Sequence, residues 1–250
     1  MSIVNTSPIV LLGGWGMPQR VLNPLAEVLT LLGYSVNCYS LSGLDNDFND
    51  SWDWQTLQSY LALLLPDQPC TLIGWSFGGA LASGLAAKYP QRVSQLITLA
   101  SNPCFVARAD WPGMDPEVFG MFLEGIEEDF SATFQRFLRL NCLGSDQLRA
   151  LLRGLSAQAK GRPDKHEVYI RSLRLLGDSD ARSFLQQVSC SALHIFAKRD
   201  SLVPCRVSSH VQDRFPHHQV ETLDGCHLIF WDKPEYVASL IHTFLNSQQS

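Results

Sequence analysis

The sequence TLIGWSFGG, from Thr71 to Gly79, joins a short apolar run to an Ala- and Leu-rich segment. The apolar run predicts a buried strand and the segment after it a helix, so a sharp turn must lie between them. Ser76 occupies this turn, where a strained backbone would hold its hydroxyl clear of the sheet. The flanking Gly74 and Gly78 lack the Cβ atoms that would keep strand and helix apart. The sequence therefore predicts a serine nucleophile at this junction.

This arrangement, Gly-x-Ser-x-Gly between a strand and a helix, resembles the nucleophile elbow of the α/β-hydrolases. The resemblance implies an oxyanion hole with two backbone donors. The N–H of Phe77, at the start of the predicted helix, is the first donor. A second apolar run, residues 8–12, leads into Gly-Gly-Trp-Gly at residues 13–16. In α/β-hydrolases the loop after this strand supplies the other donor, which we assign to the N–H of Trp15.

Strand and helix patterns alternate along the first hundred residues. Expected strands cover 8–12, 34–39, 71–73 and 95–100, with helices over 22–32, 54–65 and 79–89. Alternation of this kind predicts a parallel sheet with right-handed crossovers. The pattern resumes with strands at 192–197 and 220–223 and helices at 207–215 and 234–246. An acidic surface loop is expected over residues 44–54, including Asp45–Asp53.

Between these two parts, residues 102–188 contain apolar residues at helical spacing and no convincing strand. Phe119, Phe122, Leu123 and Ile126 follow the i, i+3, i+4, i+7 pattern of an amphipathic helix. We therefore predict a single α/β-hydrolase domain over residues 1–250, a mostly parallel sheet flanked by helices. Its core would be 1–101 and 189–250, with an inserted helical lid at about 102–188 that covers the strand ends where ligands bind.

The acid and the base of a catalytic triad are expected after later strands, in the order Ser, acid, His. Asp200 directly follows the strand at 192–197, and His227 follows the last strand. His227 would accept the Ser76 proton, and Asp200 would orient the imidazole and stabilise its charged form. Asp224 is an alternative acid, although its place three residues before His227 is more typical of a turn. For the other six histidines we expect surface or structural roles.

Bulk composition argues for a globular protein that needs no metal or cofactor. The 250 residues are 46% hydrophobic and 17% charged with a net charge of −5, which gives no sign of nucleic-acid binding. No apolar run reaches 18 residues, and the N-terminal segment lacks the features of a signal peptide, so we expect a cytoplasmic protein without a membrane span. The seven scattered cysteines contain no Cys-x-x-Cys pair and predict reduced thiols rather than a zinc site. We expect a monomer.

Within the α/β-hydrolases, the chain is similar to the pimeloyl-[acyl-carrier protein] methyl ester esterases of biotin synthesis, the BioH family. The matching segments are LLGGWG (11–16), GWSFGG (74–79) and above all ASNPCFVARADWPG (100–113), with DSLVP (200–204). The resemblance covers essentially the whole chain. It implies a serine carboxylesterase that hydrolyses the methyl ester of pimeloyl-acyl carrier protein and releases methanol, with the acyl carrier protein as partner.

The resemblance also implies roles for residues of the lid. The family's arginines that meet the acidic carrier protein fall on Arg136, Arg149 and Arg153, and Phe137 would line the acyl tunnel. A further family arginine falls on Ser131, and the His-Gly that usually begins the oxyanion loop is Gly13-Gly14 here. Residues 139–182 hold nine basic and five acidic residues, a net of 9 − 5 = +4 in a chain of −5. Such a basic face is suited to steering an acidic partner.

Two alternative functions remain open from the sequence. One is a general short-chain carboxylesterase, or a carbon–carbon bond hydrolase of the same fold. The other is a non-catalytic hydrolase-like binding protein. The presence of Ser76, Asp200 and His227 disfavours the second alternative, because such relatives usually lose a member of the triad.

Overall fold

The computed structural model of the chain describes residues 7–41, 53–161 and 165–247. Its centre is a sheet in which neighbouring strands are all parallel, in the order β2-β1-β3-β4-β5-β6. The strands are β1 (Ile9–Leu12), β2 (Val36–Tyr39), β3 (Cys70–Trp75), β4 (Val93–Leu99), β5 (Ser191–Ala197) and β6 (Gln219–Leu223). The predicted parallel sheet is confirmed. The expected strands lie within two residues of the observed ones at nearly every end.

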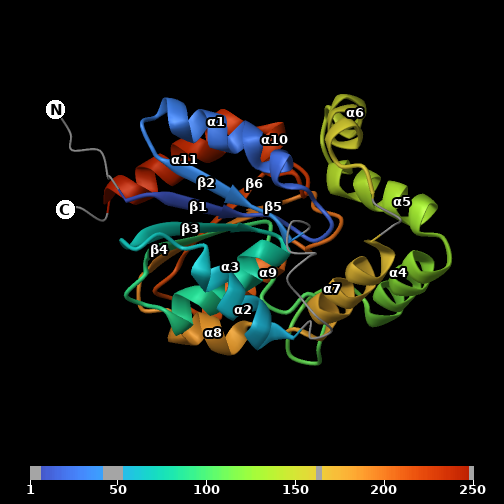
Figure 1. Cartoon of the computed structure of the whole chain (residues 1–250), viewed down its shortest axis with the longest axis horizontal. Coiled ribbons are helices and arrows are strands. Elements are labelled where there is room, and N and C mark those ends of the chain that lie inside the picture. Colours follow the sequence, from blue (N-terminus) through green and yellow to red (C-terminus); the bar gives the residue numbers. More distant parts are fainter. Residues whose placement is uncertain (1–6, 42–52, 162–164, 248–250) are drawn as a thin grey trace.

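Helices cover both faces of the sheet (Figure 1). Helices α1, α10 and α11 lie on one face, and α2, α3 and α8 lie on the other. The flanking helices are η1 (Gln19–Leu22), α1 (Asn23–Leu31), α2 (Trp54–Leu63), α3 (Phe77–Lys88), α8 (Arg182–Gln187), α9 (Val207–Arg214), α10 (Ile229–Asp232) and α11 (Pro234–Ser247). The sheet is buried on both sides, which explains why β1 and β3 consist entirely of buried residues.

Four helices between β4 and β5 stand beyond one end of the sheet. They are α4 (Pro116–Glu128), α5 (Phe130–Cys142), α6 (Leu148–Gln158) and α7 (His166–Asp178). Figure 1 shows them past the tips of the strand arrows, that is, at the carboxyl ends of the strands. The last helix of the inserted stretch, α8, instead packs on α3 beside the sheet. The division of the chain into a core and a lid remains a prediction.

Local sequence signals fix where these helices begin. Asp129 ends α4 and caps α5, accepting a hydrogen bond from the N–H of Ala132 at 3.0 Å. Asp115 caps α4 in the same way, with Pro116 at the first helical position. Asp53 caps α2. Most of the acidic loop predicted over residues 44–54 lies outside the described residues.

The turn after β3 is the tightest point of the fold. Ser76 has φ 54° and ψ −123°, a backbone conformation that few non-glycine residues adopt. A Cβ atom added to Gly74 would lie 2.3 Å from the carbonyl oxygen of Gly78, and one added to Gly78 would lie 2.4 Å from that of Leu12. The hydroxyl of Ser101, after β4, donates to the Ser76 carbonyl at 2.7 Å and supports the turn.

Two histidines are buried in the core near β4, β5 and β6. His194 Nδ1 is hydrogen-bonded to Thr98 Oγ1 at 2.7 Å, and its Nε2 to His218 Nδ1 at 2.9 Å. Burial lowers the pKa of His194 to about 3 and that of His218 to about 4, with a further contribution to the latter from His217. Both are therefore neutral structural groups, as expected for His194 from its place inside a strand.

We expect Gly74→Ala to destabilise the protein by about 1–3 kcal/mol or more, because the new methyl group would meet backbone atoms that cannot move aside. The matched control is Gly120→Ala in α4, where no atom lies within 4 Å of the added Cβ. The control should be neutral or stabilising by up to about 1 kcal/mol. Urea unfolding measures both, and equal effects at the two positions would contradict the close packing of the turn.

Because His194 and His218 are buried in their neutral forms, we expect the free energy of unfolding to fall in mild acid. Their ordinary pKa is 6.5, so the unfolded chain takes up protons below that pH, whereas the folded chain does so only near pH 4 and 3. The stabilisation is complete above pH 6.5, and it falls with falling pH by up to about 1.4 kcal/mol per pH unit for each histidine. Urea unfolding at pH 7, 6 and 5 should show this decline. His194→Gln should make it shallower, and the exposed control His210→Gln should leave it unchanged.

Candidate active site

Asp200 and His227 form a buried pair at the carboxyl ends of β5 and β6. His227 Nδ1 is hydrogen-bonded to Asp200 Oδ2 at 2.7 Å, and both side chains are only 1% exposed. The other carboxylate oxygen, Oδ1, accepts from the N–H groups of Leu202 at 2.8 Å and Val203 at 2.9 Å. The loop after β5 thus fixes the carboxylate independently of its hydrogen bond with the imidazole. This arrangement suits an acid that fixes the tautomer of a catalytic base.

The alternative acid, Asp224, is engaged elsewhere. Its carboxylate pairs with Arg199, with Arg199 Nε 2.9 Å from Oδ1 and an Nη atom 3.0 Å from Oδ2. Its side chain is also 55% exposed. The geometry therefore favours Asp200 over Asp224 as the partner of His227.

Ser76 faces the pocket beneath the inserted helices. The loop that carries His227 lies against the end of β3, because the ring of Trp75 is 5.6 Å from the imidazole. Among the described residues, no hydrogen bond joins the Ser76 hydroxyl to His227. Bonds between nucleophile and base are often long before substrate binds. The structure thus brings the predicted acid and base into contact and places the predicted nucleophile close to them.

The two predicted oxyanion donors belong to residues near Ser76. Phe77 is the first residue of α3, and Trp15 follows Gly14, whose added Cβ would lie 3.2 Å from the Ser76 Cβ. Within the described part of the chain, neither the N–H of Phe77 nor that of Trp15 donates a hydrogen bond. Two free donors next to a candidate nucleophile, one of them at a helix N-terminus, are what an oxyanion hole requires.

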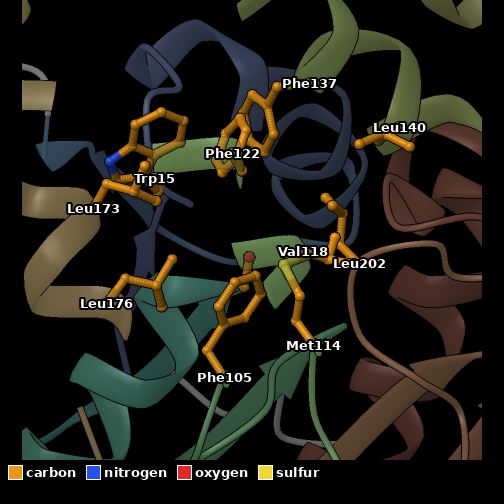
Figure 2. Close-up of a pocket in the computed structure, with 11 residues that line it drawn as sticks. Trp15, Phe105, Met114, Val118, Phe122, Phe137, Leu140, Leu173, Leu176 and Leu202 are labelled. Carbon is orange, nitrogen blue, oxygen red and sulfur yellow. The ribbon is translucent and has the colours of Figure 1, made fainter. Parts of the chain in front are cut away.

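A largely apolar pocket opens above Ser76. It holds about 500 Å³, its open mouth included. Figure 2 shows its side chains pointing toward a common space. The lining residues are Trp15, Ser76, Phe105, Met114, Val118, Phe122, Phe137, Leu140, Leu173, Leu176 and Leu202. Val118 is 53% exposed and marks the mouth on α4. Among the described residues, no charged side chain lines the pocket, so it suits an uncharged acyl chain.

Trp15 joins the body of the protein to the inserted helices. Its indole N–H lies 3.0 Å from Ser172 Oγ and 3.2 Å from the carbonyl oxygen of Tyr169, both on α7. Its ring packs edge-on against Phe137 of α5, with centroids 5.1 Å apart. Phe137 also lines the pocket, and its role in an acyl tunnel stays a prediction from the family resemblance. The same residue that offers a backbone donor to the site also fixes the helices above it.

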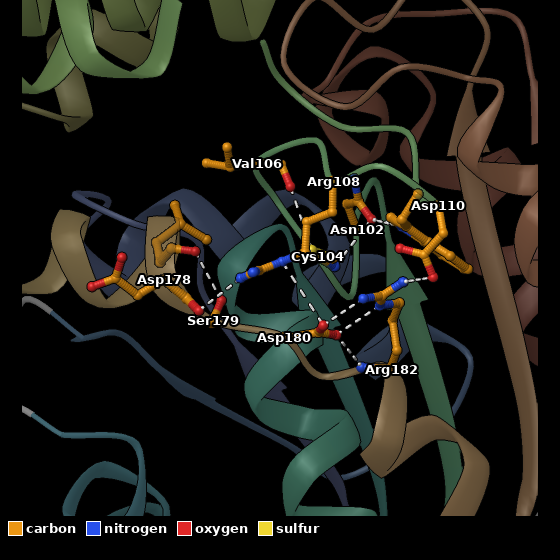
Figure 3. A network of polar contacts seen from close by, with 11 residues as sticks. Asn102, Cys104, Val106, Arg108, Asp110, Asp178, Ser179, Asp180 and Arg182 are labelled. Carbon is orange, nitrogen blue, oxygen red and sulfur yellow. Dashed lines mark hydrogen bonds and ion pairs between the residues drawn. The ribbon is translucent and has the colours of Figure 1, made fainter. Parts of the chain in front are cut away.

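Residues 100–114, the segment after β4, form a strap that carries Phe105 and Met114 into the pocket. Figure 3 shows the polar contacts that hold it. Arg182 of α8 donates to Asp110 on the strap at 2.9 Å and forms two short bonds to Asp180. These bonds from Arg182 lower the pKa of Asp180 below its usual value. The distinctive sequence at 100–113 thus has a structural role in shaping the pocket.

The three predicted carrier-contact arginines lie exposed on the inserted helices. Arg136 is on α5, and Arg149 and Arg153 are one turn apart on α6, opposite its buried residues Leu151 and Leu155. None of the three has a hydrogen bond or ion pair within the described part of the chain. Arg174 on α7, in contrast, pairs with Glu127 at 2.6 Å. The unpaired arginines are available to an external partner.

Sequence reasoning missed several residues of the site. Trp75, inside the Gly-x-Ser-x-Gly motif, contacts the His227 loop, and Ser101 supports the turn at Ser76. Leu202, two residues after Asp200 in the sequence, also lines the pocket. A signal was present for Trp75 and Leu202, because each lies within two residues of a predicted triad member. Ser101 is brought to the turn only by the pairing of β3 with β4.

The described residues contain no group of three or more His, Cys, Asp or Glu side chains that could hold a metal ion. None of the seven cysteines forms a disulfide. Among the described helices, none has the length and apolar character needed to cross a membrane.

Comparison with known proteins places these observations in a family. A family model described as alpha/beta hydrolase fold matches residues 8–234. The pimeloyl-[acyl-carrier protein] methyl ester esterase of Aeromonas salmonicida (strain A449) is 35% identical over 246 residues, covering 95% of this chain and 94% of the relative. The protein of the same name from Yersinia enterocolitica is 33% identical, covering 97% of this chain and 93% of the relative.

Solved structures show the same fold at lower sequence identity. The esterase EaEST from Exiguobacterium antarcticum superposes with a TM-score of 0.82 at 19% identity, covering 97% of this chain and 93% of the esterase. A bromoperoxidase from Bacillus anthracis also gives 0.82, at 20% identity over 96% of this chain and 92% of that protein. The predicted α/β-hydrolase fold is thereby confirmed.

Proposed function

We propose a function from the family to which the chain belongs: it is an α/β-hydrolase and, within that fold family, a member of the pimeloyl-[acyl-carrier protein] methyl ester esterases. On this premise, it hydrolyses the methyl ester of a pimeloyl group carried by acyl carrier protein, in biotin synthesis. The observation that carries the proposal is an apolar pocket that reaches Ser76 beside the buried Asp200–His227 pair. Such a pocket accepts a methylene chain that ends in an uncharged ester.

In the first half of the reaction, Ser76 Oγ attacks the carbonyl carbon of the methyl ester as His227 Nε2 takes its proton. The N–H groups of Trp15 and Phe77 stabilise the oxyanion, each contributing about 3–4 kcal/mol to the transition state. The tetrahedral intermediate collapses, and the C–O bond to the methoxy group breaks. His227 gives its proton to the departing oxygen, so methanol leaves and an acyl-enzyme remains.

In the second half, a water molecule loses a proton to His227 and attacks the acyl-enzyme. The bond to Ser76 then breaks, the proton returns to Ser76, and the chain leaves as a carboxylic acid. Asp200 stabilises the imidazolium in both halves without itself taking the proton. Its two hydrogen bonds from the loop N–H groups keep the carboxylate directed at His227 throughout.

The carrier protein docks on the exposed face of α5 and α6 in this proposal. Arg136, Arg149 and Arg153 have no partner among the described residues and offer positive charge to an acidic surface. Charges at the rim of an interface contribute to steering and orientation more than to affinity. The pocket mouth near Val118 and Leu140 lies on the neighbouring helices α4 and α5, within reach of an acyl chain that enters from this face.

We further propose that the enzyme works in the cytoplasm as a monomer, without metal, cofactor or nucleic acid. The proposed chemistry needs only the serine, the imidazole, the carboxylate and water. Each proton that His227 removes is returned within the same turnover.

Ser76→Ala should reduce kcat by about 10⁶-fold while leaving the fold intact, because no other described residue that lines the pocket carries a hydroxyl or thiol nucleophile. Hydrolysis of a p-nitrophenyl ester and circular dichroism test these two statements. Ser59→Ala, an exposed serine on α2, is the matched control and should retain full activity. Near-normal hydrolysis by Ser76→Ala would refute the mechanism.

Reversal of charge in Arg149→Glu/Arg153→Glu should lower kcat/KM for pimeloyl-acyl carrier protein methyl ester at least about 10-fold, since attraction to the acidic carrier becomes repulsion. Hydrolysis of a small p-nitrophenyl ester should not change. Arg206→Glu/Arg214→Glu at the ends of α9 alters the net charge equally and is the control for non-specific electrostatics. A wild-type enzyme that cleaves the small ester and ignores the carrier substrate would leave a general esterase as the function.

A further inference from the structure

Trp75 makes a direct contact with the backbone of the predicted catalytic base. Its indole N–H donates a hydrogen bond of 3.1 Å to the carbonyl oxygen of His227. Its ring lies 5.6 Å from the imidazole at an interplanar angle of 47°. Both residues are almost completely buried, at 2% and 1% exposure. A hydrogen bond in such an environment resists competition from water.

The same side chain contacts two more parts of the site. A Cβ atom added to Gly14, next to the oxyanion donor of Trp15, would lie 3.1 Å from Trp75 Cε3. On the far side of the His227 loop, Phe230 of α10 packs edge-on against the indole with centroids 5.1 Å apart. Trp75 thus lies between the oxyanion loop and the loop of the base, and it directly precedes Ser76 in the chain.

Several contacts hold the loop that carries His227, residues 224–228. The imidazole is fixed by Asp200 through Nδ1, which sets the ring's orientation. The backbone is held by the N–H of Leu228, which donates to the carbonyl of Asn141 at 3.1 Å, and by the bond from Trp75. The loop carbonyls also accept hydrogen bonds from the N–H of Arg199, to Gly225 at 3.0 Å, and from Lys233 Nζ, to Asp224. Of these contacts, only the one from Trp75 comes from the strand that carries the nucleophile.

We propose that Trp75 is a positioning residue that sets the distance between His227 and Ser76. Ser76 follows Trp75 directly, so the indole and the nucleophile move as one rigid unit at the end of β3. Through its N–H, this unit fixes the base relative to the nucleophile. The inference rests on the proposed roles of Ser76 and His227, but it does not depend on which ester is the substrate.

Trp75→Phe tests the inference, since it keeps an aromatic ring and removes the N–H donor. The rate at which a fluorophosphonate labels Ser76 reports the alignment of nucleophile and base directly. We expect this rate, and kcat for a p-nitrophenyl ester, to fall about 10- to 100-fold, the upper value corresponding to a misplacement of about 1 Å. KM should change much less. The downfield proton signal of the Asp200–His227 hydrogen bond should persist in nuclear magnetic resonance spectra.

Tyr34→Phe is the matched control. The Tyr34 side chain is also buried, at 3% exposure, and its hydroxyl is hydrogen-bonded to His242 Nδ1 at 2.8 Å, so the substitution keeps a ring and removes a comparable bond away from the pocket and from His227. We expect a similar fall in the urea midpoint with little change in the labelling rate. If Trp75→Phe does not fold, Trp75→His, which keeps a ring N–H, serves in its place and should label faster than Trp75→Leu.

The outcomes separate this inference from the proposed function. Labelling of Trp75→Phe at the wild-type rate, or an equal loss in Tyr34→Phe, would overturn the positioning role and leave the esterase proposal intact. Slow labelling of Trp75→Phe would support the positioning role even if the wild-type enzyme ignored the carrier-bound ester, because the probe tests only Ser76 and its base.

Discussion

The close approach of β3 and α3 is the constraint on which the rest of the site depends. Ser76 can adopt a positive φ only because Gly74 and Gly78 leave no side chain between strand and helix. The turn is then braced from outside by the Ser101 hydroxyl. Backbone strain of this kind costs about 1–3 kcal/mol and persists only where the surroundings enforce it. Here the parallel sheet enforces it, since β1 and β4 flank β3 on both sides.

The inserted helices depend on a second constraint, the contact of Trp15 with α5 and α7. Its ring and its indole N–H engage these two helices while its backbone stays at the end of β1. Helices α5 and α7, which cover the pocket, are therefore held by the same loop that borders the nucleophile. A shift of these helices would be transmitted to this loop, which links the shape of the acyl pocket to the geometry at Ser76.

Much of this organisation could be predicted from the sequence because it rests on local signals. The Gly-x-Ser-x-Gly turn, the alternating strands and helices, and Asp200 and His227 directly after strands are all readable from neighbouring residues. The full pocket was not predictable, because Phe105, Leu173 and Leu202 come from three distant segments that meet only in the folded chain. Trp75 illustrates the same limit. Its position in the motif was evident, but its bond to His227 joins residues 152 apart in the sequence.

The apolar wall of the pocket has a consequence for what happens after bond cleavage. An ester end is neutral and enters at little cost, whereas the acid formed from it is ionised at neutral pH. A carboxylate in this pocket loses its hydration and finds no charged partner among the described lining residues, a penalty of several kcal/mol. The reaction thus converts an ester that the pocket binds well into a carboxylate that it binds poorly. Product departure is driven by the pocket itself, and the free acid is a poor competitor for the next ester.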